Sequence, residues 1–242
     1  MSEGRLYGVG VGPGNPDLLT VKATKVIAAA PVVAFFAKAG RRGNARGIVD
    51  PLLKPWHVEL PLYYPMTTES HFDDPPYRDA LNDFYRKSAA AIATHLEAGR
   101  DVALLAEGDP LFYGSFMHLF VRLRERFAVT IVPGVSSICG AWGVAGEAMT
   151  WGDDCLVVLP ATLPLDELAR RLQGADAAVI IKIGRNFARA KEALAMAGMA
   201  ERAIYVERAT MAGEAVMPLE RKADGPAPYF SLILVPGRGR RP

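Results

Sequence analysis

The chain has 242 residues, half of them hydrophobic, which is enough for two modest domains with cores of their own. Its formal net charge of +2 gives no argument for a nucleic-acid partner, and no apolar run reaches the roughly 18 residues that cross a membrane. The first residues lack the pattern of a secretory signal, and the two cysteines, Cys139 and Cys155, have no metal-ligand spacing. We therefore expect a cytoplasmic protein with reduced thiols, with no metal site and no membrane or nucleic-acid partner.

The first predicted element is a strand over residues 5–12, which runs into a loop rich in glycine and proline. The loop fails the dinucleotide fingerprint G-x-G-x-x-G. Its sixth position is Pro13 when the pattern starts at Gly8, and Asn15 when it starts at Gly10. No lysine followed by serine or threonine makes it a phosphate-binding loop. We expect its backbone to approach a ligand closely, and nothing in it marks a pyrophosphate site.

The elements predicted next are a helix over 18–30, a strand over 31–36, a basic loop over 38–46, a short helix or turn over 48–53, a strand over 56–60, a long loop over 61–78 and a helix over 79–98. The basic loop contains Arg41, Arg42 and Arg46. The plain interpretation of these charges is a solvated surface loop. The functional one is a set of cations for an acidic ligand, because guanidinium groups pair with carboxylates through two hydrogen bonds.

The stretch 106–114, Ala-Glu-Gly-Asp-Pro-Leu-Phe-Tyr-Gly, follows an apolar run over 102–105 that predicts a buried strand. Asp109 before Pro110 is typical of a helix start, so we expect a capped helix over 111–127. The turn then lies just past the carboxyl end of a strand, where open α/β sheets bind ligands. Taken alone, it is equally well explained as a capping turn.

Two other turns of the same kind favour the functional interpretation. They are the glycine loop described above and residues 132–137, Val-Pro-Gly-Val-Ser-Ser, and each directly follows an apolar run. Three such turns suggest several loops that meet around one ligand.

The second half of the chain continues the alternation of helices and strands. The predicted elements are strands over 128–132, 156–160, 177–183, 203–207, 214–218 and 230–235, and helices over 138–145, 165–172 and 186–197. We place a domain boundary at 132, which gives domains 1–132 and 133–242, and we expect both to be α/β.

Several kinds of catalytic chemistry lack support. The chain has no H-E-x-x-H motif, no cluster among its four histidines and no G-x-S-x-G nucleophile turn, and Cys139 has no histidine partner in sequence. Glu107 and Asp109 form at most a weak acid–base pair. A reaction whose reactive group arrives on a bound co-substrate fits better.

Three segments closely resemble the tetrapyrrole methylase family in order and spacing: Val9–Pro16, Glu107–Gly114 and Val132–Ser137. Within the family, residues 60–67 and 228–235 are most similar to the enzymes that methylate carbon 20 of precorrin-2 in cobalamin biosynthesis. The resemblance covers nearly the whole chain and implies two α/β domains of the class III methyltransferase fold, with S-adenosyl-L-methionine in the cleft between them. It also implies a homodimer, and precorrin-3A and S-adenosyl-L-homocysteine as products.

The resemblance further implies which residues hold the co-substrate: Pro13, Gly108, Asp109, Phe112, Ser136, Ser137, Ile183, Ala209 and Ser231. The last three rest on the alignment of the second domain rather than on a motif. Asn15 departs from the family pattern, which usually has aspartate at that position.

The implied chemistry makes modest demands on the protein. The sulfonium carries its own leaving group and carbon 20 of the reduced ring is electron-rich, so the transfer needs mostly positioning and desolvation. Candidates for accepting the proton then lost from carbon 20 are Glu107, Asp109 and Tyr113. Candidate partners for the carboxylates on the substrate's rim are Arg41, Arg42, Arg46, Arg185 and Arg189.

Alternatives stay open at this point. They are cobalt-precorrin-2 as the substrate, another tetrapyrrole such as uroporphyrinogen III, and the family members that modify diphthamide or ribosomal RNA, although the low net charge disfavours RNA. An alternative of another class is a protein that binds a tetrapyrrole without chemistry.

Overall fold

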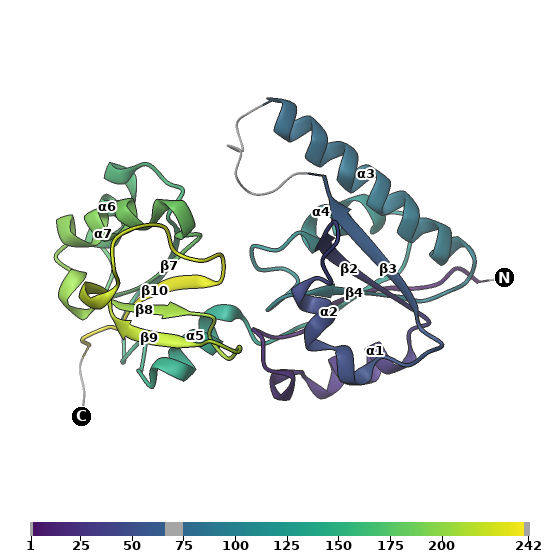
Figure 1. Ribbon diagram of the computed structural model, residues 1–242, viewed down its shortest axis with the longest axis horizontal. Coiled ribbons are helices and arrows are strands. Elements are labelled where there is room, and N and C mark those ends of the chain that lie inside the picture. The colour runs from purple at the N-terminus through teal and green to yellow at the C-terminus, as the bar shows by residue number, and fades with distance from the viewer. Residues whose placement is uncertain (1, 66–74, 240–242) are drawn as a thin grey trace. The chain divides into compact units, whose positions relative to one another are not determined.

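The computed structural model describes residues 2–65 and 75–239 (Figure 1). It divides into two compact units, Met1–Ser136 and Ser137–Pro242, and each contains a five-stranded sheet. Residues 66–74 and 240–242 lie outside the described residues, and with them Met66 and Thr67 of the segment that resembles the precorrin-2 enzymes.

The sheet of the first unit is parallel throughout, with strand order β3-β2-β4-β1-β5. Its strands are β1 (Leu6–Gly10), β2 (Val32–Lys38), β3 (Val58–Tyr64), β4 (Val102–Ala106) and β5 (Val129–Val132). Every residue of the central strand β4 is buried, as its continuous apolar run predicts for a strand covered on both faces.

Helices cover both faces of this sheet (Figure 1). They are α1 (Val21–Ala29), α2 (Asn44–Ile48), α3 (Pro75–Glu97) and α4 (Phe116–Leu123), with short 3-10 turns at Pro16–Leu18 and Asp50–Leu52. Leu104 packs into the core beneath α3 and α4, and Leu105 into the core beneath α1 and α2. Neighbouring strand residues therefore supply opposite faces, as the pleat requires.

The second unit has a mixed sheet with strand order β6-β7-β10-β8-β9. Its strands are β6 (Leu156–Pro160), β7 (Ala177–Ile181), β8 (Ile204–Glu207), β9 (Ala215–Pro218) and β10 (Ser231–Val235). Helices α6 (Leu165–Gln173) and α7 (Phe187–Met196) pack on one core, while α5 (Ser137–Ala145) contacts β8 and β10. The remaining 3-10 turns are Gly184–Asn186, Ala200–Arg202 and Leu219–Arg221.

The prediction of a long loop over 61–78 was wrong at both ends. β3 extends through Pro61 to Tyr64, because β3 is the edge strand of its sheet, where a proline interrupts no ladder on the open side. The helix α3 begins at Pro75, because prolines are tolerated in the first turn, whose N–H groups have no partner within the helix.

The predicted helix over 111–127 begins later than expected, at Phe116. The Oδ1 atom of Asp109 accepts a hydrogen bond of 2.9 Å from the N–H of Leu111, which closes a local turn instead of capping a helix. Tyr113 then has a φ angle of 54°, in the left-handed region, so the chain cannot continue as a right-handed helix there.

Candidate functional site

Three of the loops singled out in the sequence meet at one edge of the first unit's sheet. They follow β1, β4 and β5, which are parallel neighbours and therefore end at the same edge. The connections after β1 and β4 leave on opposite faces, through α1 and α4, which makes the boundary between these two strands the switch point of the sheet. Open α/β sheets bind their ligands at this position.

Glycines let the three loops approach one another closely. The N–H of Gly108 donates a hydrogen bond of 2.8 Å to the carbonyl of Gly12, and the N–H of Gly12 donates one of 3.3 Å to the carbonyl of Gly108. A Cβ atom on Gly10 would lie 2.5 Å from the nitrogen of Gly134 and 2.7 Å from the oxygen of Gly108. A side chain on Gly10 would separate the loops, so glycine is required at this position.

Asp109 ties the loop after β4 to the loop after β5. Besides its bond to Leu111, the Asp109 carboxylate accepts a hydrogen bond of 3.2 Å at Oδ2 from the N–H of Gly134. Both carboxylate oxygens therefore hold backbone groups of the loop edge. This role is structural, and it leaves Asp109 a weaker candidate for accepting a proton than its neighbours.

The end of the loop after β4 presents side chains to solvent. Leu111 and Tyr113 are 45% and 46% exposed, and Phe112 is partly buried with its ring edge-on to that of Tyr113. The left-handed conformation of Tyr113 is costly for a residue with a Cβ, and such strain concentrates at functional sites. Pro13 of the glycine loop is also partly buried.

Glu107 precedes this turn and is accessible to solvent. The pKa of Glu107 is raised above its usual value because the surrounding protein disfavours the charged form. Hydrogen bonds from the side chain of Asn44 and the backbone N–H of Ala45 oppose this effect. A carboxyl group with a raised pKa accepts a proton more readily than an ordinary carboxyl group.

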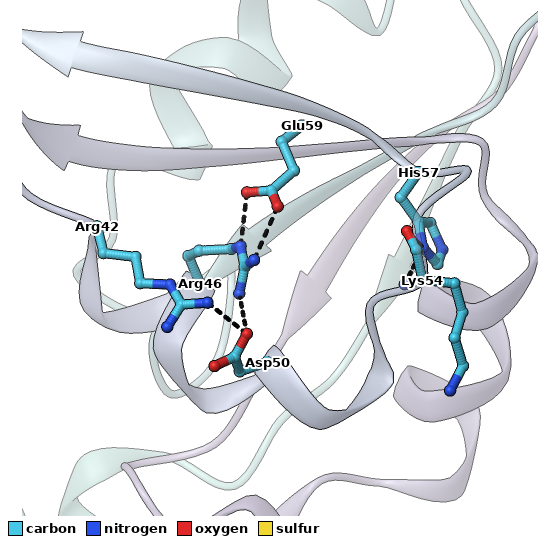
Figure 2. A network of polar contacts seen from close by, with 6 residues as sticks. All are labelled: Arg42, Arg46, Asp50, Lys54, His57 and Glu59. Atoms are coloured by element: carbon cyan, nitrogen blue, oxygen red, sulfur yellow. Dashed lines mark hydrogen bonds and ion pairs between the residues drawn. The ribbon is translucent and has the colours of Figure 1, made fainter.

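The basic loop differs from the set of free cations that the sequence suggested. Arg46 is buried, with 6% of its surface exposed, and Figure 2 shows its guanidinium between two carboxylates. Its Nε and Nη2 atoms donate to the two oxygens of Glu59 at 2.6 and 2.7 Å, and Nη1 donates to Asp50 at 2.8 Å. Arg46 is therefore occupied within the protein, and we leave it out of the proposed substrate site.

Three of the other candidate arginines are exposed. Arg42 pairs with Asp50 at 2.5 Å but keeps 61% of its side chain exposed, and Arg41 and Arg185 also lie at the surface. Arg189 instead donates to the backbone carbonyls of Ala161 and Leu163 at 3.3 and 3.4 Å.

The second unit brings its three candidate co-substrate residues to one edge of its sheet. β7 and β8 end at this edge and β10 begins there, since both pair antiparallel with β10. Ile183 and Ala209 each follow a strand end, and Ser231 is the first residue of β10. The side chain of Ile183 is fully buried in the core, so only its backbone is available to a ligand.

The backbone strain at this edge was not predicted from the sequence. Lys182, Arg208 and Thr210 have φ angles of 57°, 49° and 65°. Lys182 directly follows β7, Arg208 directly follows β8, and Thr210 lies just beyond Arg208. Ser136 and Ser137 are the residues at which the two units divide, Ser136 partly buried and Ser137 exposed.

Among residues 2–65 and 75–239, no group of three or more His, Cys, Asp or Glu side chains could hold a metal ion. Within the same residues, no helix is both long and apolar enough to cross a bilayer.

Solved structures share this architecture. Cobalt precorrin-4 methyltransferase CbiF superposes with a TM-score of 0.72 at 22% identity, covering 96% of this chain and 94% of that one. Uroporphyrin-III C-methyltransferase of Thermus thermophilus, solved with S-adenosylhomocysteine, superposes with a TM-score of 0.66 at 25% identity. The match covers 96% of this chain and 92% of that one. The fold is that of the class III methyltransferases. The chain belongs to the Tetrapyrrole (Corrin/Porphyrin) Methylases, whose family model matches residues 5–223.

Sequence comparison finds similar proteins within this family. A precorrin-2 C(20)-methyltransferase of Sinorhizobium is 57% identical over 239 residues, covering 99% of this chain and 98% of that protein. A cobalt-precorrin-2 C(20)-methyltransferase of Salmonella typhimurium is 33% identical, covering 96% of both. The cobalamin biosynthesis protein CobIJ of Mycobacterium tuberculosis is 50% identical over 99% of this chain, which spans 47% of CobIJ.

Proposed function

We propose that this chain transfers a methyl group from S-adenosyl-L-methionine to carbon 20 of precorrin-2, giving precorrin-3A in cobalamin biosynthesis. The observation that carries the proposal is the 57% identity, over nearly the full length of both chains, to a precorrin-2 C(20)-methyltransferase. The geometry agrees with it, because the family's loop motifs lie at the switch-point edge of a parallel sheet.

The loop edge of the first unit suits a positively charged co-substrate. The segments 10–16, 106–114 and 132–137 contain two carboxylates, Glu107 and Asp109, and no lysine, arginine or histidine. The co-substrate supplies an activated methyl group on a sulfonium cation, which such surroundings do not repel. Proposed contacts are Pro13, Gly108, Asp109, Phe112, Ser136 and Ser137 in and after these loops, and Ile183, Ala209 and Ser231 in the second unit.

Glu107 is the proposed acceptor of the proton that carbon 20 loses after methylation. It is accessible to solvent, and its raised pKa brings it closer to the working pH than an ordinary carboxyl group. Asp109 is engaged by two backbone N–H groups. Tyr113 remains the second candidate, since it is exposed on the same loop.

Exposed arginines are the proposed partners of the substrate's carboxylates. Arg41 and Arg42 lie on the loop before α2, and Arg185 follows β7 in the second unit. Their planar guanidinium groups match a carboxylate through two hydrogen bonds. Arg46 is excluded because Glu59 and Asp50 already take its donors.

The proposal extends to a cytoplasmic homodimer. Its support is the resemblance to the family, together with exposed apolar side chains on and beside the edge strand β3, namely Trp56, Val58 and Tyr63. Exposed apolar groups at a sheet edge favour burial against another chain.

The test is an anaerobic incubation with S-adenosyl-L-methionine labelled in its methyl carbon, with precorrin-2 and cobalt-precorrin-2 offered in parallel. Mass and carbon NMR spectra should show one added methyl at carbon 20. The cobalt form is included because a cobalt-precorrin-2 enzyme is also a relative, and we expect the metal-free ring to react faster. A stable complex without transfer to either ring would instead indicate a binding protein.

A further inference from the structure

The ion-pair cluster around Arg46 is not explained by the proposed reaction. Every donor on the Arg46 guanidinium that bonds in the structure reaches Glu59 or Asp50, and only 7% of the Arg46 side chain is exposed. The hydrogen bonds that Arg46 donates to Glu59 and Asp50 raise the pKa of Arg46 and so favour its charged form, although burial opposes this. An arginine held at three points fixes the parts of the chain that carry its partners.

These contacts lock the short helix α2 in place. Arg46 lies on α2, Asp50 follows it, and Glu59 lies on β3, so the cluster ties the helix to the edge of the sheet (Figure 2). Gly43, which precedes the helix, approaches β2 so closely that a Cβ atom would lie 2.6 Å from the oxygen of Phe36. Ala45 is buried in the same core as Leu105 of β4.

The first residues of α2 influence Glu107, which directly follows the strand β4 that α2 contacts. Hydrogen bonding by the side chain of Asn44 and the backbone of Ala45 lowers the pKa of the Glu107 carboxyl. Glu107 lies two residues beyond Leu105, so the packing of Ala45 and these hydrogen bonds act on adjoining parts of the same segment. The contacts therefore run from Glu59 through Arg46 and α2 to Glu107.

We propose that Arg46 is a positioning residue for methyl transfer, which acts by holding α2 so that Asn44 and Ala45 orient the Glu107 carboxyl. The inference rests on the proposed function, because it gives Glu107 the role of proton acceptor. Arg46 then acts, through α2, on the carboxyl group of Glu107 and does not bind the carboxylates of the substrate.

Four charged groups on and beside α2 are paired with one another. Arg42 and Arg46 pair with Asp50, and Arg46 also pairs with Glu59. On the loop that carries Glu107, the other carboxylate is that of Asp109, which accepts hydrogen bonds from the backbone N–H groups of Leu111 and Gly134. The Glu107 pKa is raised because the surrounding protein partly replaces water, and it is lowered by the two neutral donors of α2. Displacing α2 should remove those donors and raise the Glu107 pKa further.

A double-mutant cycle separates positioning from simple structural support. Arg46→Lys keeps the charge and loses the paired hydrogen bonds to Glu59, and we expect it to lower kcat about tenfold with little change in the KM of S-adenosyl-L-methionine. In a Glu107→Gln background the same change should alter kcat less than about twofold, because the group it positions is gone. Asn44→Ala, at an exposed position, should behave in the same way even if Arg46→Lys folds poorly.

The matched control is Arg126→Lys, which alters another arginine–glutamate pair of the first unit, to Glu97 at 2.6 Å, and should leave kcat unchanged in both backgrounds. Equal losses of kcat for Arg46→Lys with and without Glu107 would overturn the inference. A second measurement does not depend on turnover: carbon NMR of protein labelled at the glutamate side-chain carboxyls, with the Glu107 signal identified by its loss in Glu107→Gln. The Glu107 pKa should rise in Asn44→Ala and Arg46→Lys, and an unchanged pKa would overturn the inference even if precorrin-2 proves not to be the substrate.

Discussion

The carboxylate of Asp109 and the backbone N–H of Gly134 are joined by a hydrogen bond of 3.2 Å, although 25 residues separate them in the chain. This bond links the loops after β4 and β5. It also shows why an aspartate follows the glycine of the loop: the carboxylate takes over backbone donors that the loops leave without partners in the sheet.

Replacing Asp109 by alanine should weaken co-substrate binding while the fold is retained. The change removes two hydrogen bonds to backbone, which we expect to cost about 1–2 kcal/mol of unfolding free energy, and it loosens the edge that we propose binds the co-substrate. Calorimetry should show S-adenosyl-L-homocysteine binding at least about tenfold more weakly. The control is Asp101→Ala, which removes a similar bond, 2.7 Å to the N–H of Arg5, and should not affect binding. Wild-type affinity in Asp109→Ala would contradict this role.

Replacing Gly134 by alanine should harm both stability and binding. A Cβ atom at this position would overlap the carbonyl oxygen of Gly108 and lie 2.8 Å from the Cα of Gly10, so the loops must separate. We expect a loss of roughly 2–4 kcal/mol in urea denaturation, a magnitude typical of overpacking at a rigid contact. Gly143→Ala serves as the control, because its Cβ atom would meet nothing within 4 Å on helix α5. Equal stability of the two variants would argue against close loop contact.

Replacing Arg41 and Arg42 together by alanine should raise the KM of the tetrapyrrole substrate several-fold and leave S-adenosyl-L-homocysteine affinity unchanged. The physical reason is the loss of two exposed cations that are the proposed partners of the substrate's carboxylates. Steady-state kinetics at fixed ionic strength provide the measurement. A double change of Arg170 and Arg171, which pair with Glu167 on α6, removes the same charge elsewhere and controls for net charge. An unchanged substrate KM would remove this loop from the site.

Replacing Arg46 by alanine should destabilise the protein, whatever its effect on activity. Its partners are about half exposed, so we expect roughly 2 kcal/mol, less than a fully buried pair would lose. The hydrogen bond from Arg46 lowers the pKa of Glu59. This contribution is therefore present above the unfolded pKa of Glu59 and is lost as the pH falls through the lower folded value. The stability difference between wild type and Arg46→Ala, from urea denaturation, should shrink in acid, and a constant difference would argue against the ion pair.

The raised pKa of Glu107 predicts opposite effects on activity and on stability. As a proton acceptor Glu107 must be ionised, so kcat should fall as the pH drops through its pKa, at a higher pH than for an ordinary carboxyl group. For stability, a carboxyl group with a raised folded pKa favours the native state at low pH. This contribution is lost as the pH rises from the unfolded pKa through the folded one. Glu107→Gln should therefore lose activity yet be at least as stable as wild type at pH 7. A less stable and fully active variant would refute both parts.

The sequence by itself determined most of the elements and the family. Continuous apolar runs predicted the strands over 102–105 and 156–160, and these are confirmed as β4 and β6. The physical reason holds for β4, because a strand buried on both faces needs no polar positions. The alternation of helices and strands predicted two α/β units, and this is also confirmed. The three loop motifs indicated the tetrapyrrole methylases, to which the chain belongs.

Only the tertiary structure decided what the polar side chains do. Arg46 belonged to a basic run in the sequence, and its burial between Glu59 and Asp50 depends on the position of an edge strand that the run does not specify. The close approach of Gly10 to Gly134 likewise joins segments that are brought together only by the parallel order of the strands. Local patterns report backbone preference and burial, whereas the partner of a charge depends on which distant segments pack together.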